Sequence, residues 1–140
     1  MPIYEKNWIA FMNINFNKKT LDIILRVGVF GTFLGHGVFA LGVKTSWIPF
    51  LTVLGFTTDA AIEFMPIIGV LDIIVAILAL IKPMRVVFLY AFIWALLTSL
   101  IRPIVGFPIW DFVERSSNWV VPLAILYLRG FPKTLKELFK

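Results

Sequence analysis

Apolar residues form four long runs along the chain, and each run is predicted to be a helix that crosses a membrane. The first three runs cover residues 21–43, 60–81 and 86–106. Each has about 20 residues, which as a helix span roughly 30 Å of hydrocarbon. The fourth, residues 109–129, reaches that length only if its polar beginning is included, and such residues are tolerated when they face other helices. The pattern predicts an all-α, membrane-embedded four-helix bundle that forms one domain over residues 1–140.

A shorter apolar run, residues 47–56, lies between the first and second predicted spans. It has about half the length that a spanning helix needs. Pro49 also interrupts it, and a proline removes a backbone donor from a helix. We therefore expect a short re-entrant or interfacial segment here rather than a fifth span.

Basic residues are distributed unequally between the two sides of the predicted bundle. Four spans bring both termini and the turn after the second span to one side. That side carries Lys6, Lys18, Lys19, Lys82, Arg85, Arg129, Lys133, Lys136 and Lys140. The positive-inside rule then predicts that both termini are cytoplasmic. Residues 1–20 would form a cytoplasmic or interfacial arm, and residues 130–140 a basic cytoplasmic tail.

Composition supports a membrane protein and excludes several kinds of site. Hydrophobic residues make up 60% of the chain and the mean hydropathy is +0.94, whereas soluble domains are about 45–50% apolar. The net charge of +5 comes from residues between apolar runs, which does not predict nucleic-acid binding. There is no cysteine, so disulfides, thiolate metal sites and iron–sulfur clusters are excluded. With one histidine, we expect no metal site.

The first predicted span has a small-residue face. Gly28, Gly31, Gly35 and Gly42 share one side of the helix, and Gly31 and Gly35 form a GxxxG pair. These glycines are predicted to let a neighbouring helix approach closely. His36 stands beside that face, rotated toward the adjoining one.

Charged residues on the next spans also align with small side chains. Asp72 shares a face with Gly69, Ala76 and Ala79, near the predicted middle of the bilayer. Arg102 shares a face with Ala91, Ala95, Thr98 and Ser99. Because an unpaired charge in hydrocarbon costs several kcal/mol, both side chains are expected to point into the bundle.

Depth along the helices suggests that these groups share one pocket. At about 1.5 Å per residue, His36, Arg102, Glu114 and Arg115 fall in the outer half of the bilayer. A pocket that opens toward the non-cytoplasmic side would collect them. The candidate pocket residues are His36, Asp72, Arg102, Asp111, Glu114, Arg115 and Asn118. Candidate aromatic walls are Trp94, Trp110 and Trp119, with Trp47 anchoring a lid formed by the short fifth segment.

Three stretches resemble the DoxX-like family of small integral membrane proteins. They are RVGVFGTFLGHGVFALG in the first span, MPIIGVLDIIVAILALIKPMR across the second, and RPIVGFPIWDFVERSSNWVVPLAILYLRG across the fourth. Together they cover most of residues 21–130. The resemblance implies a four-helix bundle in a bacterial cytoplasmic membrane. The family includes small subunits associated with thiosulfate:quinone oxidoreduction, and no catalytic residue can be transferred from it to this chain.

Three functions remain open at this point. The first is an accessory or structural subunit of a membrane redox complex, without activity of its own, in which the polar cluster sets helix register. The second is a subunit that binds quinone or another small ligand in the pocket. The third is a small-solute or proton-coupled carrier that uses Asp72, although the lack of a visible inverted repeat argues against it. The expected partners are other membrane subunits, with a homo-oligomer as the alternative.

Overall fold

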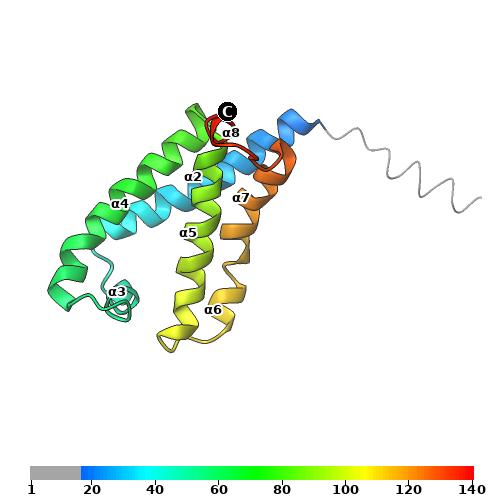
Figure 1. Cartoon of the computed structure of the whole chain (residues 1–140). Coiled ribbons are helices and arrows are strands. Elements are labelled where there is room, and N and C mark those ends of the chain that lie inside the picture. Colours follow the sequence, from blue (N-terminus) through cyan, green and yellow to red (C-terminus); the bar gives the residue numbers. More distant parts are fainter. Residues whose placement is uncertain (1–16) are drawn as a thin grey trace, which may run out of the picture.

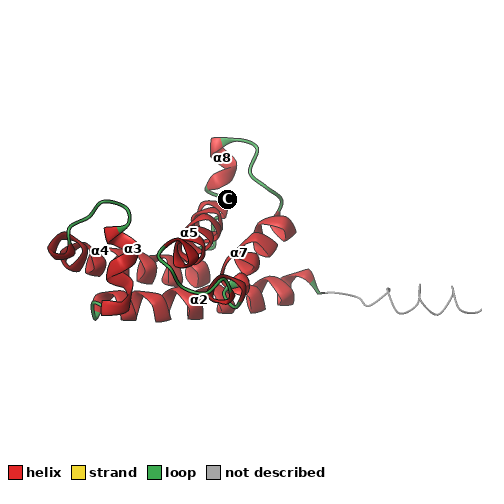
Figure 2. Ribbon diagram, turned by 90° about the horizontal axis from the view of Figure 1, so that it is seen from below, coloured by secondary structure: helices red, strands yellow, loops and turns green. Residues whose placement is uncertain are grey.

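The computed structural model describes residues 17–140, and every regular element in that range is a helix, which confirms the all-α class. Three long apolar helices, α2 (Lys18–Leu41), α4 (Thr58–Ile81) and α5 (Arg85–Ile104), are long and apolar enough to cross a membrane. The shorter elements are η1 (Thr45–Trp47), α3 (Ile48–Thr52), α6 (Trp110–Val113), α7 (Ser116–Arg129) and α8 (Leu135–Leu138). Figure 2 shows this all-helical arrangement. Residues 1–16 of the predicted arm 1–20 lie outside the described residues.

Capping residues explain why two helices begin before their apolar runs. The Asn17 side chain accepts hydrogen bonds from the backbone N–H groups of Lys19 and Thr20, at 3.1 and 3.3 Å. The Thr57 side chain accepts one from Ala60 N–H at 3.2 Å. Each bond satisfies a backbone donor that the first turn of a helix leaves free. The helices therefore begin at residues 18 and 58, rather than at the predicted 21 and 60.

The predicted fourth helix, residues 109–129, is not continuous. It is divided into α6 and α7, with a break at Glu114 and Arg115. Polar side chains at this point compete with the helical backbone bonds. The Arg115 guanidinium indeed donates to the backbone carbonyl of Asp111 at 3.1 Å. α7 alone is about 21 Å long, shorter than the roughly 30 Å of a bilayer's hydrocarbon, and it is not among the three candidate membrane spans.

α2 and α4 form one packed pair and α5 and α7 form the other, and the two pairs meet at one end. α2 packs along α4 and α7, and α5 packs along α7. α4 and α5 diverge from the turn that joins them, with α3 near the far end of α4 and α6 near the far end of α5 (Figure 1). The main core lies where α2, α4, α5 and α7 meet, and a second small core lies under α3. The predicted segment 47–56 contains the short helix α3, which packs against α4 and α5.

The closest helix crossing does not use the predicted glycine face. A Cβ atom on Gly37 would lie 2.7 Å from Ile73 Cγ1 and 2.9 Å from Gly69 O, and one on Gly69 would lie 2.8 Å from Gly37 O. α2 and α4 therefore touch at Gly37 and Gly69. Sequence spacing identifies small faces, but it does not say which neighbour approaches them.

The four predicted glycines have looser surroundings. A Cβ on Gly28 would make an ordinary 3.5 Å contact with Val121 of α7. At Gly31 and Gly35 it would meet no described atom within 4 Å, and Gly42 is the C-terminal cap of α2. Only Gly28 of this set therefore packs against another described helix.

Large apolar side chains cover the outside of the long helices. Examples are Ile24 on α2 at 61% exposure, Ile67 on α4 at 52% and Leu97 on α5 at 54%. Such a surface is unfavourable in water but suits the hydrocarbon of a bilayer. The structure therefore supports a membrane protein with three candidate transmembrane helices.

Candidate functional site

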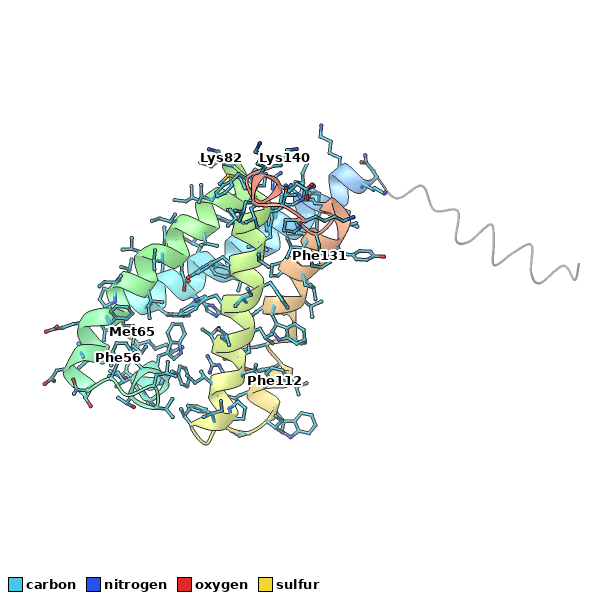
Figure 3. The ribbon with its side chains drawn as sticks, in the orientation of Figure 1. Phe56, Met65, Lys82, Phe112, Phe131 and Lys140 are labelled. Atoms are coloured by element: carbon cyan, nitrogen blue, oxygen red, sulfur yellow. The ribbon has the colours of Figure 1, made fainter. Side chains whose placement is uncertain are left out.

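A cavity of about 450 Å³ lies between α2, α3 and α4 on one side and α5 and α7 on the other. It is at the end of the molecule where α4 and α5 have diverged. In Figure 3 this end carries Met65 and Phe56, and Lys82 and Lys140 lie at the opposite end. Most of its walls are apolar side chains. The structure brings five predicted pocket residues to these walls: His36, Asp72, Arg102, Arg115 and Asn118.

Asp72 is the most buried charged residue of the cavity wall. It is 3% exposed, and its Oδ1 atom has no hydrogen-bond partner among the described residues. It lies on the buried face of α4 with Met65, Gly69 and Ala76, as its spacing predicts. Trp94 of α5 lines the same cavity.

Arg102 is the second buried charge. It is 8% exposed, and its Nε atom also lacks a partner among the described residues. Its Nη1 atom lies 3.9 Å from Asp111 Oδ2, which is too long for a hydrogen bond. Its guanidinium lies 5.0 Å from the centre of the Phe50 ring, within the range of a cation–π contact. Arg102 thus enters the cavity with part of its donor capacity unused.

The other two predicted pocket residues are not part of the described cavity wall. The Asp111 side chain is 29% exposed and faces Arg102 from α6. The Glu114 side chain is 64% exposed and pairs with the neighbouring Arg115. The helix break explains this outcome, because Asp111 lies on α6 and Glu114 lies in the break, whereas Asn118 lies on α7.

The short segment before α4 forms one wall of the cavity. Trp47, Phe50 and Leu51 line it, and the Trp47 ring meets the His36 ring edge-on, with centroids 5.7 Å apart. This agrees with the lid position predicted for Trp47. His36 precedes Gly37, and Asp72 precedes Ile73, so both polar residues flank the helix crossing and lie at similar depth.

The predicted aromatic walls are partly correct. Trp94 lines the cavity. Trp110 is 71% exposed on α6, and Trp119 stacks on Phe112 with ring centroids 6.1 Å apart. Neither of these two belongs to the described cavity lining. The exposed end of α6 therefore carries Trp110 outward, away from the cavity.

The opposite end holds a charged cluster that the sequence did not predict as a unit. We call Arg26, Arg85 and Arg129 the arginine clasp. Arg129 of α7 donates to both carboxylate oxygens of Asp22 on α2, each at 2.6 Å, and also to the Pro83 carbonyl. Asp22 also lies 3.7 Å from Arg26 on the same helix, which is the weaker contact.

The other two clasp residues bind backbone carbonyl groups. Arg26 donates to Ala79 O at 2.7 Å and to Leu80 O, which are carbonyls at the end of α4. Arg85 donates to Gly130 O, Arg129 O and Glu137 O at 2.9, 2.7 and 3.3 Å. The sequence shows that these arginines accompany apolar helices. It does not show their hydrogen-bond partners, which lie 44 to 107 residues away along the chain.

The described residues contain no group of three or more His, Asp or Glu side chains that could hold a metal ion. Comparison with protein-family models, with curated proteins and with solved structures found no match to this chain. Functional inference therefore rests on the cavity and on the membrane-compatible helices.

Proposed function

We propose that this chain is a DoxX-like, multi-pass subunit of a membrane redox complex and that its cavity binds a quinone-type ligand. One observation carries the proposal. Asp72 and Arg102 are almost fully buried, each has an unpartnered polar atom among the described residues, and both line one mostly apolar cavity. The chain itself is proposed to bind and orient the ligand, and electron transfer would be the task of a partner subunit.

A ligand with polar groups on a flat apolar ring suits these walls. A buried polar atom without a partner costs about 1–3 kcal/mol, so a ligand that supplies the partner gains that energy on binding. The Arg102 guanidinium can donate to a quinone carbonyl oxygen. The Asp72 carboxylate can accept from a quinol hydroxyl group. The rings of Trp47, Phe50 and Trp94 offer apolar surface to the ring between them.

A purely structural role for the polar groups is the second candidate, and the Arg102–Asp111 contact favours it. However, structural polar networks are normally satisfied, because unpaired buried groups destabilise the fold. The arginine clasp has that property, whereas Asp72 and Arg102 do not. A carrier of polar solutes is less favoured, because the cavity wall offers few polar groups along its length.

The proposed topology has four crossings, with α6 and α7 together making the fourth. The contacts Asp22–Arg129 and Arg85 N–H to Lys140 O support it, because the first joins the beginning of α2 to the end of α7 and the second joins the beginning of α5 to residue 140. That end also carries Lys18, Lys19 and Lys82. The positive-inside rule then favours an orientation with the arginine clasp on the cytoplasmic side and the cavity in the outer half, and the resemblance to DoxX-like proteins implies a bacterial cytoplasmic membrane.

Quinone binding can be measured on the full chain in lipid nanodiscs through quenching of tryptophan fluorescence. We expect saturable binding of a benzoquinone that weakens about tenfold or more in Asp72→Asn and Arg102→Gln, since each loses a charge-assisted hydrogen bond. Glu114→Gln is the matched control, because this exposed carboxylate lies outside the described lining. Equal affinity in all four proteins would contradict the proposal.

The association of this chain with an oxidoreductase can be tested separately. Gentle detergent extraction and affinity purification from a native membrane should recover an oxidoreductase together with this chain. Recovery of a homo-oligomer alone would contradict the proposed redox complex. Quinone binding would still be tested independently by the fluorescence measurement.

A further inference from the structure

One part of the cavity lining, formed by residues that follow α3 and by residues of α5, is apolar and exposed at the surface, and we call it the rim. Four of its lining residues are also strongly exposed on the outside of the molecule. They are Val53 at 47%, Leu54 at 65%, Leu97 at 54% and Ile104 at 68%. By contrast, the polar lining residues Asp72, Ser99 and Arg102 are buried. The exposed part of the lining is therefore apolar, whereas its polar residues are buried or half-buried.

In the proposed membrane orientation, Leu97 of the rim lies at the depth of lipid tails, and Ile104 lies at the end of α5. Leu97 is seven residues before the end of α5, which places it about 10 Å along the helix from that end. Phe50 and Leu51 of α3 close the cavity behind the rim. A solute arriving from water would have to pass this apolar rim, whereas a molecule dissolved in the bilayer meets it directly.

The size of the cavity limits what it can enclose. About 450 Å³ lies in the lower part of the range of small-molecule pockets, which is about 300–1,000 Å³. That volume accommodates a substituted ring but not a ring together with a long chain. A tailed ligand would have to leave part of itself outside, and the rim supplies the exit.

We infer that the ligand is a two-part lipid, whose polar ring lies between Asp72 and Arg102 and whose apolar tail leaves between α3 and α5 into the bilayer. This rests on the proposed binding function and specifies its ligand class and route. Leu54 and Leu97 are then specificity-determining residues, because they contact the tail and not the ring. The side-on path also explains why α3 stands as a separate short helix against α5.

The test compares two probes on the full chain in nanodiscs: a benzoquinone with a long isoprenoid tail and its tail-less counterpart, both dosed per lipid. Leu97→Trp and Leu54→Trp should fill the exit. We expect each to weaken binding of the tailed probe by about tenfold, equivalent to about 1.4 kcal/mol, and to change the tail-less probe less than about twofold. Ile74→Trp, on the exposed face of α4 outside the described lining, is the control.

A second measurement needs no substitution. A tailed probe with a photoreactive group at the end of its tail should label lipid and the outer faces of α3 and α5. Labelling near Asp72 or Trp94 instead, or equal loss of both probes in the rim variants, would overturn the tail route while ring binding remains. If neither probe binds the unaltered chain, the proposed function itself fails.

Discussion

The two ends of this helical protein differ in how their charged side chains are partnered. At the clasp end, Arg26, Arg85 and Arg129 are joined to a carboxylate or to carbonyl groups of other elements. At the cavity end, Asp72 and Arg102 keep polar atoms without partners among the described residues. The comparison shows that buried charge by itself does not indicate a site. A site is indicated by buried charge that faces open volume and lacks a partner.

The difference follows from how the helices diverge. At the clasp end the helices converge (Figure 1). The long arginine side chains there donate hydrogen bonds to the backbone of neighbouring elements. At the other end α4 and α5 have separated, and the space between them is closed only partly by η1 and α3. The first arrangement stabilises the fold, and the second leaves room for a ligand.

The largest expected effect is at the clasp. Arg129→Met removes both bonds to Asp22 and leaves that carboxylate without its main partner. We expect the free energy of unfolding to fall by about 3 kcal/mol, as is typical when one partner of a largely buried ion pair is removed. Unfolding by denaturant in mixed micelles measures it. The double variant Asp22→Leu/Arg129→Met should recover much of the loss, and failure to recover would mean that the pair is not the cause.

The second largest effect on stability is expected at the crossing of α2 and α4, where Gly37 and Gly69 meet. Gly69→Ala places a Cβ 2.8 Å from two backbone atoms of α2, Gly37 O and Leu41 N. Backbone atoms cannot move aside cheaply, so we expect a loss of about 2 kcal/mol in the same unfolding assay. Gly35→Ala is the matched control, because its Cβ would meet no described atom within 4 Å. It should be neutral or stabilising by up to about 1 kcal/mol, since alanine favours a helix.

The cavity end should give an effect of opposite sign. Asp72→Leu removes a buried carboxylate that is incompletely partnered, so stability should rise by about 1 kcal/mol, as in other replacements of buried charge by apolar groups. The same variant should lose quinone binding in the fluorescence assay. A clear loss of stability would instead mean that Asp72 stabilises the fold. The two ends of the molecule would then not differ in the way proposed.

The smallest effect should be at the exposed pair Glu114–Arg115. Glu114→Gln should change the free energy of unfolding by less than about 0.5 kcal/mol, because exposed ion pairs contribute little. Quinone binding should be unaffected as well. A large change in either measurement would return Glu114 to the functional cluster.

Local patterns predicted much of the architecture. The faces of α4 and α5 that carry Asp72 and Arg102 are buried as their spacing predicted, because helical periodicity depends only on the sequence. The break in the predicted fourth helix was missed, because apolar length does not record how Arg115 competes for backbone carbonyl groups. Gly37 was missed for a similar reason: its neighbour across the crossing is 32 residues away, at Gly69.

The sequence by itself determined that the chain is helical, membrane-compatible and basic at one end, and it selected most of the polar residues that line the cavity. Those properties depend on composition and on the local period of the helix. Only the tertiary structure decided that Arg129 holds Asp22, that Glu114 lies outside the described cavity lining, and that exposed apolar residues such as Leu54 and Leu97 line the cavity. These outcomes depend on where distant helices converge or separate, which is a property of packing and not of any single segment.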